Sequence, residues 1–422
     1  MIQALEIMPG VTLRHCPDHR FKHGCLSFQL VWPMCAEEAG LNALIPAILL
    51  RGTTAHPDLR SITLALDELY GASVSTLVRR AGDYQTTGLF CSFMEDRYAL
   101  PGDRVLEPLI AFLGELLLSP RTQDGGFVPE IVDSEKKNLI STIDSERNDK
   151  RAYAMAQMMR VMCRGDSYAI SRLGEREQVA AITSVRAYEH YQSILRRSPI
   201  EIFYVGTASA DHVAGMIRPI LEQIERDYVN LPANTPFSGD GAGESVTEQM
   251  EVTQARLCMG FCTPIYNRSR QYASIQVFNA LFGAGMSSKL FMNVRERLSL
   301  CYGINSIYYG SKGILVVSAG IDADREQQVK DEVLRQLDDC CRGEITDGEL
   351  TAAKEAILSS LRSTHDSPGS IEGYYSTSAL SGAGLSIQAY SDAIRAVTRE
   401  SVAEAARTVK LHTTYFLKGA VQ

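Results

Sequence analysis

The sequence predicts an α+β fold built from two similar halves, on three observations. In each half, a strand is followed by two helices and then another strand, so strands and helices gather in groups instead of alternating singly. Glycines and tyrosines recur at nearly the same offset in the two halves: Gly283 follows Gly52 by 231 residues, and Tyr302 follows Tyr70 by 232. A repeat this long indicates a duplicated domain. The length of 422 residues, 45% of them hydrophobic, also exceeds what one ordinary core accommodates.

In the first half, the spacing of apolar residues predicts each element in turn. Alternation of apolar and polar residues predicts strands, and apolar residues every third or fourth position predict helices. The expected strands are 25–33, 88–93 and 201–206, and the expected helices are 41–50, 58–69 and the long helical region 128–162.

The second half repeats this order. The expected strands are 256–263, 313–319 and 413–417, and the expected helices are 269–282, 288–298 and 347–361. Ser287 or Ser288 would cap the helix at 288–298, whose apolar stripe would be formed by Leu290, Phe291, Val294 and Leu298.

One stretch has the composition of a linker. Pro232, Pro236 and a small-residue run beginning at Ser238 interrupt every hydrophobic period there. We therefore expect an N-terminal domain at 1–230, a linker at 231–250 and a C-terminal domain at 251–422.

Composition excludes several classes of protein. A net charge of −8 disfavours binding to the phosphates of nucleic acid. The start of the chain lacks a basic segment followed by an apolar run, and no apolar stretch reaches the length of a membrane span, so we expect a cytoplasmic protein without membrane contact. The ten cysteines include no C-x-x-C pair and are expected to be reduced packing residues.

Histidines give weak signals for metal binding. His15, His19 and His23 recur every fourth residue, but a proline interrupts any helix there, and the flanking segments 11–14 and 26–30 alternate as a β-hairpin would.

The segment from Arg186 to His190 ends like an H-x-x-E-H zinc helix. Its first position is arginine, which cannot coordinate zinc. An ordinary surface helix is the favoured interpretation. An independent enzyme that uses His190 or the N-terminal histidines is the least favoured alternative.

The segment Gly285-Met-Ser-Ser-Lys-Leu-Phe-Met-Asn-Val-Arg295-Glu-Arg-Leu-Ser-Leu-Cys-Tyr302 resembles a motif of the insulinase or pitrilysin peptidases, in their mitochondrial-processing-peptidase-like bacterial branch. The resemblance extends to Arg51-Gly-Thr53, to Leu69-Tyr-Gly71 and to the two-half plan. It implies a metallopeptidase-like fold of the kind shared by LuxS and the processing peptidases, in which two homologous domains, each a mostly antiparallel sheet packed with helices, form half of a clam-shell chamber.

In active members of this family, an H-x-x-E-H helix before the Gly-Thr pair binds zinc and activates its water. The corresponding positions here are Ala43, Pro46 and Ala47. The family's third ligand falls on Thr142, while Glu135 keeps the acidic position seven residues earlier. The resemblance therefore implies no catalytic residue, no metal and no peptidase activity in this chain alone.

The same resemblance assigns substrate binding to Arg295 and Tyr302, which keep the spacing and context of the family's arginine and tyrosine. In two-subunit members, one chain supplies zinc and the other supplies this pair. The chain thus resembles the non-catalytic subunit of a heterodimeric zinc metallopeptidase, which would bind peptide substrate beside a paralogous partner that holds the zinc. The alternative is a non-proteolytic structural or peptide-binding protein of the same fold, and the isolated chain could then be a homodimer.

Overall fold

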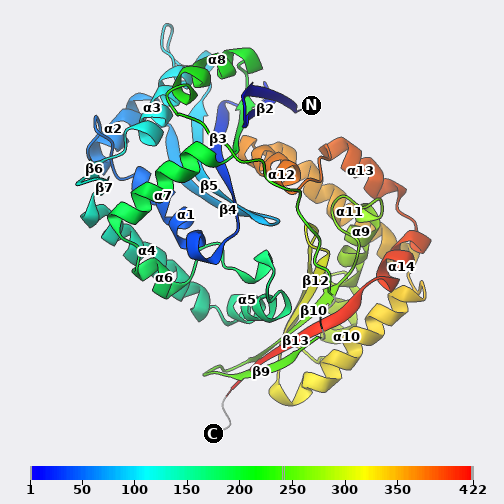
Figure 1. The fold of residues 1–422 in the computed structure, drawn as a ribbon. Helices are drawn as coiled ribbons and strands as arrows, with labels where there is room; N and C mark the ends of the chain where they lie inside the picture. Colours follow the sequence, from blue (N-terminus) through cyan, green and yellow to red (C-terminus); the bar gives the residue numbers. More distant parts are fainter. Residues whose placement is uncertain (1, 240, 242, 420–422) are drawn as a thin grey trace. The chain divides into compact units, whose positions relative to one another are not determined.

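The computed structural model describes residues 2–239, 241 and 243–419, which divide into two compact units (Figure 1). Unit 1 comprises Met1–Asp144, Ile170–Ala233 and Thr364–Thr377, and unit 2 comprises Ser145–Ala169, Asn234–Ser363 and Ser378–Gln422. Each unit therefore contains a short segment from the other half of the chain, whereas the domains expected at 1–230 and 251–422 were continuous. Positions 240 and 242 of the expected linker lie outside the described residues, and the end of that linker forms a strand, Ser245–Gln249.

The described residues of unit 1 form one large sheet and a two-stranded ribbon. The strands are β1 (Gln3–Met8), β2 (Val11–Pro17), β3 (His23–Pro33), β4 (Ser73–Ala81), β5 (Tyr84–Met94), β6 (Thr122–Gln123), β7 (Gly126–Phe127) and β8 (Ile200–Gly206). The large sheet has the order β1-β2-β8-β3-β5-β4, and β6 pairs with β7. Strands β2 and β8 are parallel, and the other neighbours are antiparallel.

The helices of unit 1 come from both halves of the sequence. They are α1 (Ala36–Leu49), α2 (Leu59–Glu68), α3 (Leu106–Leu118), most of α4 (Pro129–Asn148), α6 (Arg176–Ala180), α7 (Ser184–Arg197), α8 (Ala210–Leu221) and most of α12 (Pro368–Leu380), with 3₁₀ turns at Asp96–Tyr98 and Thr364–Asp366. Asp58 caps α2, because its carboxylate accepts a hydrogen bond from the Ser61 backbone N–H at 2.8 Å.

Strand β3 shows how the unit 1 sheet is covered on both faces. Leu26, Phe28 and Leu30 join the main core with the helices of the first half. The intervening Cys25 packs instead against Ile371 of α12. Because neighbouring residues of a strand point to opposite faces, a segment from the second half of the chain covers the face that the local helices leave open.

The sheet of unit 2 repeats the strand order of unit 1 without an equivalent of β1 among the described residues. Its strands are β9 (Ser245–Gln249), β10 (Ala255–Cys262), β11 (Gly303–Tyr309), β12 (Ile314–Ile321) and β13 (Lys410–Lys418). The order is β11-β12-β10-β13-β9, with β9 and β13 parallel and the other neighbours antiparallel. The order β4-β5-β3-β8-β2 of unit 1 has the same sequence of directions, as a duplication predicts.

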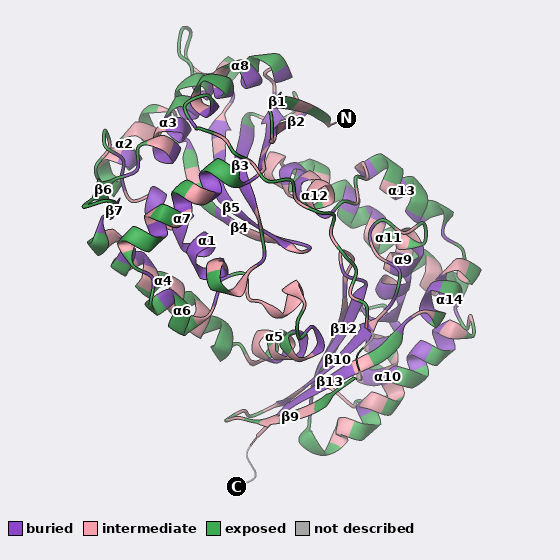
Figure 2. Ribbon diagram, in the orientation of Figure 1, coloured by how far each residue is buried: buried purple, intermediate pink, exposed green. Residues whose placement is uncertain are grey.

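Helices cover both faces of this second sheet (Figure 2). The helices of unit 2 are α5 (Lys150–Met162), α9 (Tyr272–Phe282), α10 (Glu326–Cys341), α11 (Asp347–Ser363), α13 (Ile387–Ala396) and α14 (Arg399–Arg407), with 3₁₀ turns at Ser167–Ala169 and Ala323–Arg325. In β12, Leu315 and Val317 face the main core, whereas Ile314 and Val316 pack in the cluster that includes Met158 of α5. A strand apolar on both sides is what such coverage requires.

The predicted α+β fold of two sheet-and-helix halves is confirmed, with three local corrections. The expected hairpin of 11–14 with 26–30 is wrong, because β8 lies between β2 and β3. The long helical region 128–162 breaks at Asp149, whose carboxylate caps α5 by accepting from the Arg151 N–H at 3.0 Å. The helix expected at 288–298 is a π-helix at Leu290–Arg297.

Among the described helices, none has both the length and the apolar composition to cross a bilayer.

Candidate functional site

Arg295 lies on the π-helix at Leu290–Arg297, in unit 2. The hydroxyl oxygen of Ser288 caps its start, accepting from the Phe291 N–H at 3.3 Å. The Leu298 N–H donates to the Asn293 carbonyl at 3.1 Å, a bond that spans five residues instead of four. Since this wider turn takes more residues, Leu298 leaves the predicted apolar stripe and is 41% exposed.

Three contacts hold the Arg295 side chain. Its Nε donates to the backbone carbonyl of Tyr302 at 3.1 Å, and its Nη1 pairs with Glu296 at 2.9 Å. The guanidinium also lies over the Phe291 ring, 4.6 Å from the ring centroid. The two predicted substrate-binding residues are therefore joined, and the seven-residue spacing matches the reach of an arginine to a main-chain carbonyl.

Tyr302 lies where the chain enters β11, the edge strand of the unit 2 sheet. Its backbone N–H donates to the Gly320 carbonyl at 2.9 Å, which aligns it with the end of β12. The side chain is 62% exposed, and its hydroxyl donates to Asp322 at 2.9 Å. This bond to a carboxylate raises the pKa of the Tyr302 hydroxyl, so the phenol stays protonated at neutral pH.

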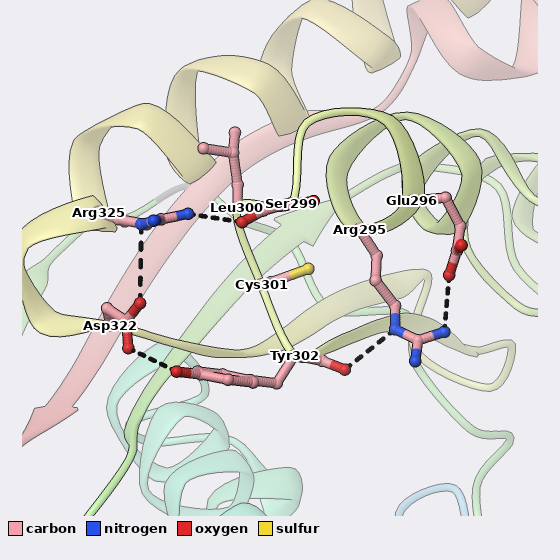
Figure 3. A pocket seen from close by; sticks show the side chains of 8 residues that line it. All are labelled: Arg295, Glu296, Ser299, Leu300, Cys301, Tyr302, Asp322 and Arg325. Atoms are coloured by element: carbon pink, nitrogen blue, oxygen red, sulfur yellow. Dashed lines mark hydrogen bonds and ion pairs between the residues drawn. The ribbon is translucent and has the colours of Figure 1, made fainter.

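Arg295 and Tyr302 line one cavity of about 440 Å³ (Figure 3). The cavity is mostly polar, and its lining residues are Arg295, Glu296, Ser299, Leu300, Cys301, Tyr302, Asp322 and Arg325. Burial raises the pKa of the Cys301 thiol to about 11, so the cavity holds no reactive thiolate at neutral pH.

Sequence reasoning missed Asp322 and Arg325. Asp322 accepts from Tyr302, and its Oδ2 lies 3.7 Å from Arg325 Nε. The signal that could have found them is the hairpin of β11 and β12. Its register places Gly303 opposite Gly320, so residues just before β11 lie beside residues just after β12.

The three zinc-helix positions lie on α1 in unit 1. Ala43 and Pro46 are buried, and Ala47 is half-buried. None of these side chains has an atom that coordinates a metal or accepts a proton. The residues therefore do not fit the family's zinc ion.

The position of the third ligand is equally unsuited. Thr142 lies exposed on α4, and its hydroxyl donates to the Asn138 carbonyl at 3.0 Å. Glu135 is buried and pairs with Arg51 at 3.1 Å, so this acidic side chain serves an ion pair. Within residues 2–239, 241 and 243–419, no group of three His, Cys, Asp or Glu side chains is arranged to hold a metal ion.

A chain of hydrogen bonds between buried side chains joins α1 to β5 and α7. His190 Nε2 lies 2.8 Å from Asn42 Oδ1, and Asn42 Nδ2 donates to Gln85 Oε1 at 3.0 Å. Burial lowers the pKa of His190, which favours the neutral ring. His190 thus has a packing role here, as the interpretation of its segment as an ordinary helix predicts. Its burial differs from the expected surface position.

The N-terminal histidines are not brought together as ligands. His15 is buried in β2, stacks on Tyr204 and lies 2.7 Å from the Ala208 carbonyl. His23 begins β3, and β8 lies between these two strands.

Each sheet ends in an edge strand at the corresponding position, β4 in unit 1 and β11 in unit 2. An edge strand presents backbone N–H and C=O groups on which another extended chain can pair. A cavity of about 320 Å³ lies along β4, lined by residues 75–79, Phe90 and Gly369.

Comparisons with known proteins agree on one family. Residues 181–357 match the model of the "Peptidase M16 inactive domain". The chain is 30% identical, over 97% of its length and 96% of the relative's, to a Bacillus subtilis protein named "Probable inactive metalloprotease YmfF".

Two solved structures share the fold. A conserved protein from Enterococcus faecalis is 26% identical, with a TM-score of 0.92 over 100% of this chain and 99% of that one. A peptidase M16 inactive domain from Pseudomonas fluorescens is 15% identical, with a TM-score of 0.80 over 100% of this chain and 98% of that one.

Proposed function

The chain belongs to the M16 peptidase family as a catalytically incomplete, peptidase-like protein. We propose that it is the non-catalytic subunit of a heterodimeric zinc peptidase. Its partner would be a paralogous chain bearing H-x-x-E-H and zinc. The observation that carries the proposal is a contrast within one chain: Ala43, Pro46 and Ala47 cannot bind metal, while Arg295 and Tyr302 line an open polar cavity.

The role proposed for this cavity is to hold the main chain of a peptide. Arg295 presents a planar fork of N–H groups that suits carbonyl oxygens, and Tyr302 carries an exposed phenol. The peptide would also add as a strand to a sheet edge. Because main-chain hydrogen bonds give affinity with little sequence preference, the extended shape and size of the peptide would select the substrate.

The test is cleavage by a reconstituted pair. The chain would be co-expressed with an H-x-x-E-H member from the same genome, and kcat/KM measured on extended fluorogenic peptides. Arg295→Ala should lower kcat/KM by about tenfold to a hundredfold, the loss expected for hydrogen bonds from a charged group, and Tyr302→Phe, which removes a neutral hydrogen bond, by about twofold to tenfold.

Matched controls separate the site from the surface around it. Arg297→Ala removes an exposed arginine of the same π-helix, and Tyr70→Phe removes an exposed tyrosine of unit 1. Neither residue lines the cavity, so both should keep wild-type kcat/KM. Cleavage that is indifferent to Arg295→Ala and Tyr302→Phe would overturn the role in trans.

The second candidate function is a non-proteolytic structural or peptide-binding protein. It is favoured by the burial of Ala43 and Pro46, because at these zinc-helix positions α1 carries apolar side chains that pack in the core of unit 1. A stable homodimer that ignores every H-x-x-E-H relative in a pull-down would support this alternative over the heterodimer.

A further inference from the structure

Asp322 connects the residues of the cavity to one another. Its Oδ1 accepts the hydroxyl hydrogen bond of Tyr302 at 2.9 Å, and its Oδ2 lies 3.7 Å from Arg325 Nε (Figure 3). Arg325 in turn donates to the carbonyl of Ser299. The Asp322 carboxylate is thus held in place by Arg325, which lies in the same turn after β12.

This contact changes what the phenol can offer a ligand. A tyrosine hydroxyl has one O–H to donate, and in Tyr302 that O–H is directed to Asp322. Hydrogen bonds to a carboxylate are roughly twice as strong as those to a neutral carbonyl. A peptide carbonyl is therefore a weaker competitor for this proton, and the lone pairs of the oxygen remain for a donor.

In the first half of the chain, the corresponding Tyr70 has a hydroxyl that both donates and accepts a hydrogen bond. The hydroxyl of Tyr70 donates to Asp103, and the same oxygen accepts from the backbone N–H of Leu100 at 3.0 Å. In the part of the chain that the structure describes, no N–H donates to the hydroxyl of Tyr302. This position is open toward the cavity.

Arg295 supplies the opposite polarity. Its Nε and Nη1 are engaged by Tyr302 and Glu296, and its Nη2 has no hydrogen-bond partner among the described residues. A peptide main chain presents both C=O and N–H groups along its edge, so one donor and one acceptor in the cavity match it.

On the basis of the function proposed above, we propose that Asp322 is a positioning residue for peptide binding. By holding the Tyr302 hydroxyl as a donor to itself, Asp322 makes Tyr302 an acceptor for a main-chain N–H of the bound peptide. Arg295 then serves as the donor to peptide carbonyl oxygens.

The first experiment needs only this chain. Tyrosine labelled with ¹³C at Cζ gives one signal per ring, and Tyr302→Phe assigns the signal of Tyr302. In wild type this signal should titrate above the usual tyrosine pKa of about 10, and Asp322→Ala should return it toward that value. Asp103→Ala should shift Tyr70 instead and leave Tyr302 unchanged. A Tyr302 titration that does not respond to Asp322→Ala overturns the proposal.

The second experiment uses the reconstituted pair and a cleaved synthetic peptide of about twelve residues, together with its single amide-to-ester analogues. Each ester removes one N–H donor. One analogue should raise KM by roughly twofold to tenfold with wild type and have no such effect with Tyr302→Phe. Asp322→Ala alone should raise KM for the parent peptide, but adding it to Tyr302→Phe should raise KM no further. Asp322→Asn keeps an acceptor for the Tyr302 hydroxyl, so its KM should lie between those of wild type and Asp322→Ala.

The outcomes distinguish this inference from the function on which it rests. If Arg295→Ala leaves cleavage unchanged, or no relative yields an active pair, the proposed function fails and the acceptor role fails with it. If Arg295→Ala impairs cleavage but every ester analogue affects wild type and Tyr302→Phe equally, only the acceptor role of Tyr302 is overturned.

Discussion

Removal of the Glu372 carboxylate should weaken unit 1. Its carboxylate is fully buried on α12 and accepts from Ser27 Oγ at 2.7 Å, from Gln29 Nε2 at 3.0 Å and from both Arg79 terminal nitrogens at 3.0 Å. Ser27 and Gln29 belong to β3 and Arg79 to the edge strand β4. One carboxylate thus joins a segment of the second half of the chain to two strands of the first.

The expected loss can be estimated from these contacts. Removing one partner of a buried ion pair costs about 3–5 kcal/mol, because the other charge loses its compensation. The Arg79 side chain is 36% exposed, so water solvates part of its charge and the lower end, about 3 kcal/mol, applies to Glu372→Ala. Glu372→Gln keeps one acceptor oxygen for the buried donors, and about 1.5 kcal/mol is expected for it.

Urea unfolding of the three proteins, followed by circular dichroism, would measure these differences. Amide hydrogen exchange would report in the same samples whether α12 opens before the rest of unit 1. The control is Glu355→Ala on α11, whose carboxylate is 59% exposed and pairs with Arg362 at 3.3 Å, and which should cost less than 1 kcal/mol. A free energy of unfolding for Glu372→Ala within 0.5 kcal/mol (about the spread of ordinary surface substitutions) of wild type would refute the reasoning.

Three further predictions concern single side chains. Lys312 is fully buried and its Nζ lies 2.9 Å from the carboxylate of Asp166, which is 22% exposed. Asp166→Ala should cost about 3–5 kcal/mol in urea unfolding, because it leaves a buried charge without this carboxylate. Lys312→Met should cost less, because the carboxylate that it leaves behind is partly solvated. Ser299 has a φ of +49°, so Ser299→Gly should relieve about 1–2 kcal/mol of strain, lose about 0.5–1 kcal/mol to chain entropy and raise the melting temperature slightly. Burial lowers the pKa of His190 from 6.5, so the unfolded chain binds a proton that the folded chain resists. Stability should therefore fall as the pH drops below about 6.5, and His190→Gln should flatten that fall between pH 7 and pH 5 in thermal melts.

The strands and helices were largely predictable because each has a local pattern. The strand expected at 256–263 and the helix expected at 58–69 both correspond to observed elements, β10 and α2. The exchange of α5 and α12 between the units was not predictable in this way. Periodicity predicts that a helix has an apolar face. Nothing in the local sequence around Met158 or Ile371 indicates which of the two sheets that face packs against.

The site divides along the same line. The Arg295 and Tyr302 pair came from a family resemblance, since spacing alone gave no reason to select it. Asp322 is twenty residues from Tyr302 in sequence and reaches its hydroxyl only through the β11–β12 register. A partner brought close by strand pairing is invisible until that register is known.

Stability gives no account of a guanidinium at position 295. The Arg295 side chain is 39% exposed, and its ion pair with Glu296 is a surface pair worth at most about 1 kcal/mol. Its contact with the Phe291 ring is worth about as much and is one that a lysine also makes. The Tyr302 carbonyl that it binds could be solvated instead. A lysine would keep the charge but lose the fork that engages a main-chain carbonyl and leaves a second nitrogen for a ligand. Arg295→Lys should therefore leave urea unfolding unchanged while lowering peptide cleavage by the reconstituted pair, and equal effects on both would place Arg295 among the packing residues of unit 2.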